Sequence, residues 1–247
     1  MRNGVFVAAR MSSSRLPRKA LLELVGRPVL SHLFERVRLS RLADEFVLCT
    51  SESTADDVLV ELADFEGIKT FRGHDTDVLA RYLGAAQQFA IDFIATADGD
   101  DVFCEPSAID GVFALAAQSG YDFVKVEGLP IGAYPYGVST RALSKVCELK
   151  DDDNTEGWGR YFTQTGMFKV GFLQITDEAL LHPDLRLTLD YEEDFQFLKT
   201  LFHELYRPGH VISLAEVVKL VRARPEVLAI NAGIQERYEQ RFRRLYS

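Results

Sequence analysis

The sequence predicts an α/β fold of the doubly wound type, in which a mostly parallel sheet carries helices on both faces and a helical C-terminal extension follows. Two observations support this prediction. Short runs of β-branched and aromatic residues recur in the N-terminal half, and segments with apolar residues at helical spacing separate them. The 247 residues suffice for one large domain with an appendage. We expect an α/β domain over residues 1–207 and a helical extension over residues 208–247.

The N-terminal half alternates between strand and helix patterns. We expect strands over Val5–Ala9, Phe46–Cys49, Ile68–Phe71 and Phe93–Ala95. The helical patterns between them run over Val29–Val37, Val58–Leu62 and Val78–Ala86. Strands joined by crossover helices form a parallel sheet, which binds ligands beyond the carboxyl ends of its strands. We therefore expect the functional site in the loops after Ala9, Cys49, Phe71 and Ala97.

The C-terminal half is less regular. We expect strands over Phe123–Val126, Lys169–Ile175 and Leu185–Leu189. The segments Gly128–Gly137 and Asp151–Gly159 have the composition of functional loops. An amphipathic helix is expected over Ser213–Arg224, where Pro225 ends it, and a charged helix is expected to run from there to Ser247.

The composition is typical of a globular protein, with 47% hydrophobic and 26% charged residues. The formal charge of −9 argues against a nucleic-acid-binding protein. No apolar run approaches the roughly 20 residues of a membrane helix, and Val5–Ala9 is too short for a signal peptide. We therefore expect a cytoplasmic protein without a membrane partner. The cysteines Cys49, Cys104 and Cys147 form no CxxC pair and are expected to be buried thiols.

A cationic segment follows the first expected strand. Residues 10–19 read RMSSSRLPRK, and residues 1–22 contain no carboxylate. Small residues after a strand let backbone N–H groups converge on an anion, while hydroxyl and guanidinium groups complete a cradle for a polyphosphate. The segment lacks both the Walker A pattern and GxGxxG. A solvated basic loop is the alternative interpretation.

The residues just described resemble a known family, the nucleotidyltransferases of the CMP-sugar synthetase type, and especially its spore coat polysaccharide SpsF-like cytidylyltransferase branch. The resemblance covers nearly the whole chain. It rests on VAARMSSSRLPRKAL (residues 7–21), FRGHDTDVLARY (71–82), the pair Gly99–Asp100, YPYGV (134–138), RLTLDYEEDF (186–195) and PEVLAIN (225–231). One departure is Arg18, where the family usually has Gly.

The resemblance implies a Rossmann-like, GT-A-like sandwich that transfers a nucleotide, usually CMP from CTP, to an acceptor. The acceptor would be an acidic sugar or a related phosphorylated or phosphonylated compound. Pyrophosphate would leave, magnesium would be the cofactor, and surface polysaccharide or glycan synthesis would be the purpose. The resemblance also implies a homodimer.

Two carboxylates are the expected magnesium ligands, Asp100 and Asp190, because each follows a strand-like run and would project from the carboxyl edge of the sheet. The resemblance matches both to ligand positions of the family. A helix N-cap is the alternative for either residue. The carboxylates of Asp98, Asp101 and Glu105 crowd the same loop as Asp100 and stay open as substitutes.

Arg15, Lys19 and Asp100 are the expected catalytic residues, with the two cations stabilising the departing pyrophosphate. The triphosphate contacts are assigned to Arg10, Ser12, Ser13, Ser14, Arg15 and Lys19. Further nucleotide contacts are expected from residues that end the first three strands, Ala8, Ala9, Thr50, Ser51 and Arg72. Asp77 and Arg81 are additional candidates, with a helix ion pair as the alternative.

The acceptor pocket is expected to combine aromatic and charged residues, because such pairs suit an acidic sugar. The candidates are Lys125, Tyr134, Tyr136, Glu156 and Arg160, and they lie near Trp158, which is either a mobile lid, a subunit contact or a packed anchor.

Three other functions stay open. A nucleotidyltransferase of this fold could use GTP or another triphosphate with a sugar 1-phosphate. A glycosyltransferase would hold its metal with an Asp-x-Asp pair, which Asp98 and Asp100 form. A nucleotide-binding regulatory protein would bind a triphosphate without turnover.

Overall fold

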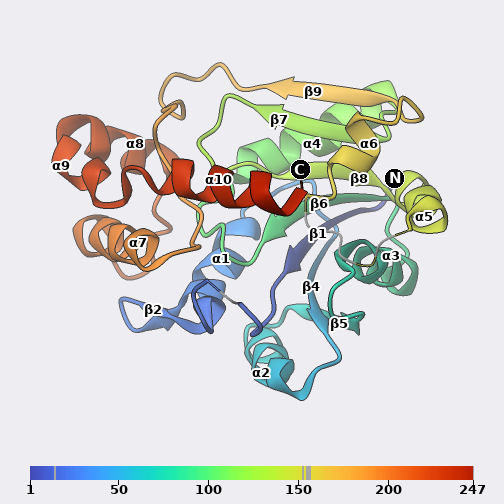
Figure 1. Ribbon diagram of the computed structural model, residues 1–247, viewed down its shortest axis with the longest axis horizontal. Helices are drawn as coiled ribbons and strands as arrows, with labels where there is room; N and C mark the ends of the chain where they lie inside the picture. Colours follow the sequence, from blue (N-terminus) through green and yellow to red (C-terminus); the bar gives the residue numbers. More distant parts are fainter. Residues whose placement is uncertain (14, 152, 154–156, 247) are drawn as a thin grey trace.

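A seven-stranded sheet forms the centre of the molecule in the computed structural model, which describes residues 1–13, 15–151, 153 and 157–246. The strand order is β5-β4-β1-β6-β8-β7-β9 (Figure 1). The strands are β1 (Asn3–Ala8), β4 (Glu45–Ser51), β5 (Lys69–Gly73), β6 (Phe93–Asp98), β7 (Phe123–Glu127), β8 (Tyr136–Ser139) and β9 (Val170–Gln174). Only β8 runs antiparallel to its neighbours, β6 and β7. The predicted mostly parallel sheet is confirmed.

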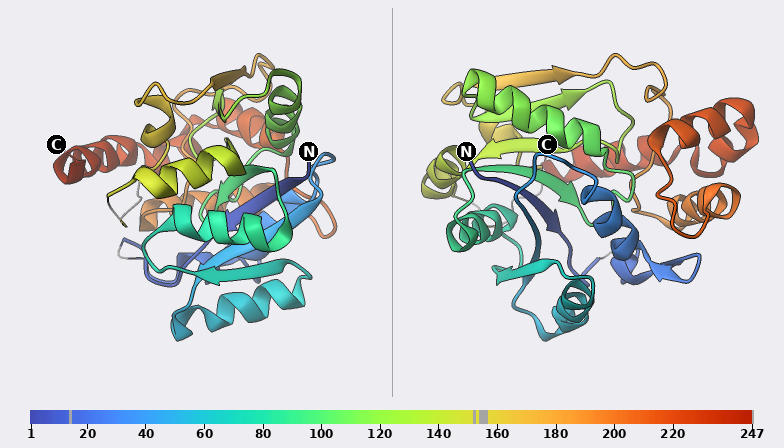
Figure 2. Two further views of the ribbon diagram at one scale, coloured as in Figure 1. Left: turned by 90° about the vertical axis from the view of Figure 1, so that its right-hand side faces the viewer. Right: turned by 180° about the vertical axis from the view of Figure 1, so that it is seen from behind.

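Helices cover both faces of the sheet (Figure 2). Along β1, Val5 and Val7 point into one hydrophobic core and Phe6 points into the other, as the two-residue period of a strand requires. The first core contains residues of α1 (Val29–Val37), α2 (Asp57–Phe65) and α4 (Pro106–Ser119). The second contains residues of α3 (Val78–Phe89) and α5 (Thr140–Leu149).

Short elements connect this framework. They are η1 (Lys19–Leu21), β2 (Glu23–Leu24), β3 (Arg27–Pro28), η2 (Thr54–Asp56) and α6 (Arg160–Thr163). β2 and β3 form a separate two-stranded hairpin before α1.

Two sequence-based assignments were wrong. The expected strand Leu185–Leu189 makes only an isolated parallel bridge between Arg186 and Ile131. Its backbone bonds go to two different segments, from Leu187 N–H to the Ile131 carbonyl and from Leu189 N–H to the Asp100 carbonyl, so no continuous ladder forms. The expected loop Gly128–Gly137 was too long, because β8 begins inside it.

The charged helix expected from Pro225 to Ser247 is interrupted among the described residues, because Gly233 has a φ of +80° and a new helix begins only after it. The C-terminal residues as a whole are mostly helical. They form α7 (Glu192–Leu205), α8 (Leu214–Ala223), α9 (Pro225–Leu228), η3 (Ala229–Asn231) and α10 (Ile234–Tyr246). A capping box between Ser213 and Glu216 begins α8. The apolar stripe of α8 is buried in the first core, so packing within the chain accounts for it. From there α10 passes across the face of the molecule viewed in Figure 1.

Two further expectations concern membrane segments and thiols. Within the part of the chain that the structure describes, no helix combines the length and the apolar composition needed to cross a membrane. Cys49 and Cys104 are buried free thiols, as expected, whereas Cys147 is only half-buried.

Candidate active site

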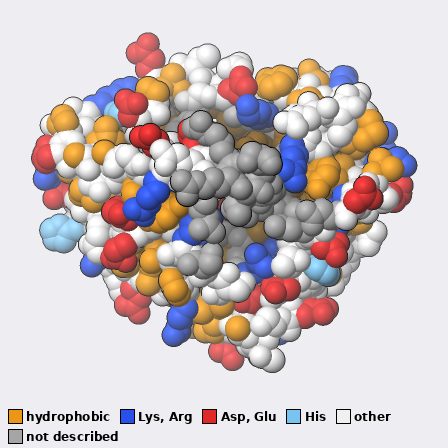
Figure 3. Space-filling model, viewed as in Figure 1, with side chains coloured by type: hydrophobic (Ala, Val, Ile, Leu, Met, Phe, Trp, Pro, Cys, Tyr) orange, Lys and Arg blue, Asp and Glu red, His pale blue; other side chains and the backbone are white. Residues whose placement is uncertain are grey.

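A cleft of about 1070 Å³ opens at the carboxyl ends of β1 and β6. These strands are neighbours, and Ala8 at the end of β1 pairs in register with Asp98 at the end of β6. The chain continues from β1 to β4 on one side, while β6 lies on the other side, so the cleft occupies the switch point of the sheet. Lys and Arg side chains lie around the centre of this face (Figure 3).

Gly99 lets the two loops at this switch point approach each other. Its N–H donates to the Ala8 carbonyl at 2.8 Å. A Cβ atom at residue 99 would lie 2.7 Å from Ala9 Cβ and 2.9 Å from the Ala8 carbonyl oxygen, closer than real Cβ contacts come. The absence of a side chain at Gly99 therefore brings Asp100 against the loop after β1.

Asp190 reaches the same place from a distant part of the sequence. Leu189 N–H donates to the Asp100 carbonyl at 3.0 Å, which joins the backbone before Asp190 to that of Asp100. Gly132 allows this segment to pass, because a Cβ atom there would lie 2.3 Å from Thr188 N, and its φ is +84°. The two carboxylates thus become neighbours without belonging to adjacent strands.

Five charged side chains form what we call the ion cluster: Arg15, Lys19, Asp100, Asp190 and Arg186. Lys19 pairs with Asp100 and lies 3.0 Å from Asp190 Oδ1. Arg15 donates to Asp190 Oδ1 from Nε at 3.1 Å and from Nη2 at 2.5 Å. Arg186 Nη2 donates to the other oxygen, Oδ2, at 2.9 Å.

The cluster favours the charged forms of Asp190 and Lys19. Burial alone would raise the pKa of Asp190, but the charges of Lys19 and Arg15 outweigh it and lower that pKa to about 2. Burial would likewise lower the pKa of Lys19, yet Asp100 and Asp190 raise it above its ordinary value. Lys19 of the predicted cradle therefore stays charged where it lines the cleft.

A second group of carboxylates lies beside this cluster. Asp98, Asp100 and Asp101 each offer an oxygen within 4.8 Å of the others. The depth of Asp98 in the cleft, together with the charge of Asp100, raises its pKa to about 7, although solvent reaches the side chain. Burial, followed by the charges of Asp100 and Asp98, raises the pKa of Asp101. Hard divalent cations bind such grouped oxygens, so these residues fit magnesium.

Glu105 is not part of this group. Its carboxylate accepts from Ser107 N–H at 3.2 Å, at the start of α4, and pairs with Arg36 at 3.2 Å. Of the four carboxylates that the sequence left open in this loop, the structure therefore gathers three.

Arg10 and Arg81 form a second cationic pair on the cleft. Both contact Asp75: Arg10 Nη1 lies 3.2 Å from its carboxylate, and Arg81 Nη1 donates to its carbonyl at 3.2 Å. Burial lowers the pKa of Arg81 and the charge of Arg10 lowers it further. Arg81 is 3% exposed, and its buried Nε has no hydrogen-bond partner among the described residues. Two guanidinium groups beside the single negative charge of Asp75 leave local positive charge for an anion.

Four predicted nucleotide contacts lie behind the cleft instead of lining it. Thr50 and Ser51 are buried and donate to the Asp56 carboxylate, from Thr50 Oγ1 at 2.9 Å and from Ser51 N–H at 3.1 Å. Arg72 donates to the Ser51 carbonyl at 3.0 Å and pairs with Asp57 at 2.6 Å.

Asp77 accepts from Ala80 N–H at 3.0 Å, which caps α3, and pairs with Lys150. None of Thr50, Ser51, Arg72 and Asp77 is among the described residues that line the cleft.

Asp56 connects these residues to the cradle. Its carboxylate also accepts from Met11 N–H at 2.7 Å, at the beginning of the cationic loop. Burial would raise the pKa of Asp56, but hydrogen bonds from Ser51, Met11 and Thr50 lower it below its ordinary value. The ionised Asp56 carboxylate thus holds the beginning of the cationic loop against the end of β4.

The opposite side of the cleft is what we call the aromatic wall: Phe123, Tyr134, Tyr136 and Trp158. The rings of Tyr134 and Tyr136 lie 5.7 Å apart, and those of Tyr136 and Trp158 lie 5.6 Å apart. Burial, followed by the neighbouring Tyr136, raises the pKa of Tyr134, so its hydroxyl stays protonated. Trp158 is 8% exposed and packs as an anchor, the third of the options the sequence left open.

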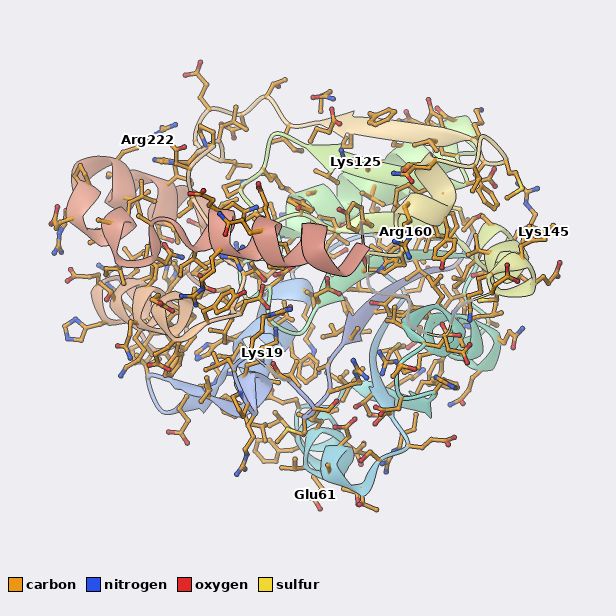
Figure 4. All side chains as sticks on the ribbon, viewed as in Figure 1. Lys19, Glu61, Lys125, Lys145, Arg160 and Arg222 are labelled. Atoms are coloured by element: carbon orange, nitrogen blue, oxygen red, sulfur yellow. The ribbon has the colours of Figure 1, made fainter. Side chains whose placement is uncertain are left out.

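Lys125 and Arg160 belong to this side of the cleft. Figure 4 shows them on one side of α10 and Lys19 on the other. Of the remaining predicted residues, Ala8, Ala9, Ser12 and Ser13 also line the cleft. Ser14 and Glu156 lie outside the described residues.

Sequence reasoning missed Arg186, Thr188 and Tyr238, which all line the cleft. Arg186 and Thr188 lie within the RLTLD run, so its two polar residues between buried leucines were an available signal. Tyr238 lies in a highly charged helix that carries no local sign of a site.

A cationic loop that faces grouped carboxylates across a cleft at the switch point of the sheet is typical of an enzyme that binds nucleotide phosphates. The chain matches the cytidylyltransferase family over residues 5–165, and it belongs to that family. The resemblance found in the sequence is thereby confirmed.

Individual relatives agree with this assignment. The chain is 28% identical over 228 residues to the spore coat polysaccharide biosynthesis protein SpsF of Bacillus subtilis, covering 89% of this chain and 94% of that protein. It is 31% identical over 227 residues to 3-deoxy-manno-octulosonate cytidylyltransferase of Geobacter sulfurreducens, covering 88% and 84%. The solved structure of a cytidylyltransferase from Leptospira borgpetersenii has a TM-score of 0.82 at 25% identity, covering 92% and 97%.

Proposed function

We propose that this enzyme transfers CMP from CTP to an acidic sugar or a related phosphorylated or phosphonylated acceptor. Pyrophosphate leaves, and the product serves surface polysaccharide or glycan synthesis. The observation that carries the proposal is the ion cluster, in which Arg15 and Lys19 of the cationic loop meet Asp100 and Asp190 at the switch point. The B. subtilis and G. sulfurreducens relatives support the pathway class and the use of a cytidine nucleotide.

The reaction is an in-line displacement at the α-phosphorus. An acceptor oxygen forms the new P–O bond as the bond to the β-phosphate oxygen breaks, so the electron pair leaves with pyrophosphate. A hydroxyl acceptor releases its proton to solvent water, whereas a phosphate or phosphonate oxygen attacks as the anion. Arg10, Arg15, Lys19 and the hydroxyls of Ser12 and Ser13 neutralise the triphosphate. Arg15 and Lys19 stabilise the departing charge, which requires no proton transfer.

The cytosine and ribose are bound near the ends of β1 and α3. The backbone of Ala8 and Ala9 lines the cleft, where small side chains let a pyrimidine edge approach. Arg81 supplies a buried guanidinium beside Arg10. Thr50, Ser51, Arg72 and Asp77 contribute indirectly, by bracing the loops that carry these groups.

Magnesium is the proposed cofactor, with Asp100 and Asp190 as its protein ligands. Lys19 pairs with both carboxylates, which indicates that they share one cation position. When bound, the ion would neutralise phosphate charge during displacement. Asp98 is the competing second ligand, because its oxygen lies within 4.8 Å of that of Asp100. Calorimetric titration of Asp98→Asn and Asp190→Asn with magnesium separates them, because only the true ligand's replacement weakens binding.

The acceptor is assigned to the aromatic wall. Lys125 and Arg160 place two cations beside tyrosine hydroxyls that remain protonated, a combination that suits a carboxylate or phosphate on a sugar-like body. Glu156 remains a proposed contact. The proposed assembly is a homodimer, which light scattering of the purified protein tests directly.

Pyrophosphate release tests the proposal. The protein is incubated with magnesium, each of the four common ribonucleoside triphosphates and a panel of acidic sugars and phosphorylated acceptors. The proposal predicts release with CTP and an acidic acceptor. Activity with a purine triphosphate and a sugar 1-phosphate alone would replace the cytidine assignment with the related alternative.

A glycosyltransferase is the second candidate, and the proximity of Asp98 to Asp100 favours it, because such enzymes hold a metal with an Asp-x-Asp pair. Sugar transfer from a nucleotide sugar, without pyrophosphate release, would support that alternative.

A further inference from the structure

The C-terminal helix α10 contacts the active site, although its sequence lies far from every predicted site residue. Arg186 Nη1 donates to Gln235 Oε1 at 2.8 Å. Arg237 pairs with Glu193 at 3.1 Å, and its guanidinium lies 4.0 Å from the centre of the Tyr191 ring. These contacts fix the first turns of α10 beside the ion cluster, and Figure 1 shows the helix passing across the front of the molecule.

Among the described side chains of α10, Tyr238 lines the cleft itself. Its ring centre lies 5.7 Å from Arg15 Cζ and 5.3 Å from Arg186 Cζ. Both arginines donate to Asp190, Arg15 to Oδ1 and Arg186 to Oδ2. One aromatic ring therefore contacts two of the three cations around the Asp190 carboxylate.

This arrangement restricts the Arg15 side chain in two ways. Hydrogen bonds from Nε and Nη2 to one carboxylate oxygen fix the edge of the guanidinium. The ring restricts its position from another direction, because a guanidinium is attracted to an aromatic face. An arginine ordered before a ligand arrives loses less conformational entropy when it binds that ligand.

We propose that Tyr238 is a positioning residue, which holds Arg15 ready for the triphosphate and makes α10 a functional part of the nucleotide site. The inference rests on the proposed function and deepens it. Tyr238 acts through Arg15, so its replacement changes the affinity for CTP more than the affinity for the acceptor.

The test measures CTP binding by calorimetry and steady-state turnover for the full-length protein and three variants. Tyr238→Phe keeps the ring, Tyr238→Leu removes it, and Gln240→Ala changes an exposed residue of the same helix. We expect Tyr238→Leu to raise both the Kd and the KM for CTP by about 3- to 30-fold, the range of a cation–π contact. Tyr238→Phe and Gln240→Ala should stay near the wild-type values, and the acceptor KM should not move in any variant.

A double-mutant cycle then tests whether Tyr238 acts through Arg15. In an Arg15→Ala background, Tyr238→Leu should change the CTP Kd by less than about twofold, because the two effects share one pathway. Circular dichroism and thermal unfolding confirm the fold, and Tyr238→Met replaces Tyr238→Leu if the latter does not fold.

Unchanged CTP affinity in Tyr238→Leu would overturn the inference, as would an equal loss in Tyr238→Phe or the full effect persisting without Arg15. A wild-type protein that binds no nucleoside triphosphate would instead overturn the proposed function itself. The two failures are therefore distinguishable.

Discussion

The two sides of the cleft are built in different ways. The ion cluster consists of charged side chains that neutralise one another at 2.5 to 3.1 Å. The aromatic wall consists of rings 5.6 to 5.9 Å apart, and two cations belong to the same side of the cleft. The first arrangement suits phosphate chemistry common to many acceptors, and the second suits recognition of one acceptor. Mutations on the two sides of the cleft should therefore affect turnover and acceptor binding separately.

The largest expected effect comes from the ion cluster. Asp100→Asn should lower kcat by about 10³-fold, because it removes a proposed metal ligand and one of the two partners of Lys19. Pyrophosphate release under saturating CTP measures the effect. Glu61→Gln, an exposed carboxylate on α2 far from the cleft (Figure 4), is the control and should keep full activity. A loss below tenfold in Asp100→Asn would place the metal elsewhere.

The aromatic side should respond differently. Lys125→Ala and Arg160→Ala should each raise the acceptor KM by about 10-fold and leave the CTP KM unchanged, since each removes one charged hydrogen-bond donor. Initial rates at varied acceptor concentration measure this change. Lys145→Ala, an exposed residue of α5 that pairs with Glu148, is the matched control. A parallel rise in the CTP KM would show that the two sides are not separable.

Asp56→Asn tests whether the Asp56 carboxylate stabilises the cationic loop. It should lower the free energy of unfolding at pH 7 by about 2 kcal/mol, because a buried carboxylate accepts hydrogen bonds from Met11, Thr50 and Ser51. Urea unfolding at several pH values measures this loss.

The sign of its pH dependence follows from the lowered pKa of Asp56. The ionised Asp56 contributes its full stabilisation above the pKa of about 4 that it has in the unfolded chain. This stabilisation is lost as the pH falls through the lower pKa of Asp56 in the folded protein. The variant should therefore lose less stability than the wild type below about pH 4. Equal slopes for the two proteins would contradict the role of the charge.

The smallest effect concerns backbone strain in the cradle. Arg18 has φ 58°, a left-handed conformation that an L-residue with a side chain adopts at some cost. Arg18→Gly should raise the free energy of unfolding by about 0.5–1 kcal/mol relative to Arg18→Ala, which controls for the lost charge. Chemical unfolding of both variants provides the measurement. A less stable glycine variant would show that the conformation carries no strain.

The sequence predicted those parts of the molecule in which local pattern decides structure. The strand and cationic loop from Val5 to Lys19 were predictable, because apolar alternation and a run of small and basic residues lie side by side. The adjacency of Asp100 and Asp190 was predictable from their positions at the ends of strand-like runs, although the second run forms no strand. Its leucines are buried, yet its hydrogen bonds go to Ile131 and Asp100.

Other features depend on packing that no local pattern reveals. Gly137 was expected to end a loop, whereas it lies within β8. Close packing requires glycine there, because a Cβ atom would lie 2.4 Å from Val112 Cγ1. Thr50 and Ser51 do end a strand, but the sequence could not show that their hydroxyls face Asp56 instead of the cleft. Tyr238 reaches the site only because the chain folds back through five helical segments after Asp190.

The most direct test of the account is CTP binding by a protein in which both cradle cations of the ion cluster are neutralised. Calorimetry with magnesium compares the wild type with the double variant Arg15→Gln/Lys19→Gln, and circular dichroism verifies the fold of both. We expect CTP affinity to be weaker by about 100-fold or more and pyrophosphate release to be unmeasurable, because two charged hydrogen-bond donors to the triphosphate are lost. Undiminished CTP affinity and turnover in the double variant would contradict it.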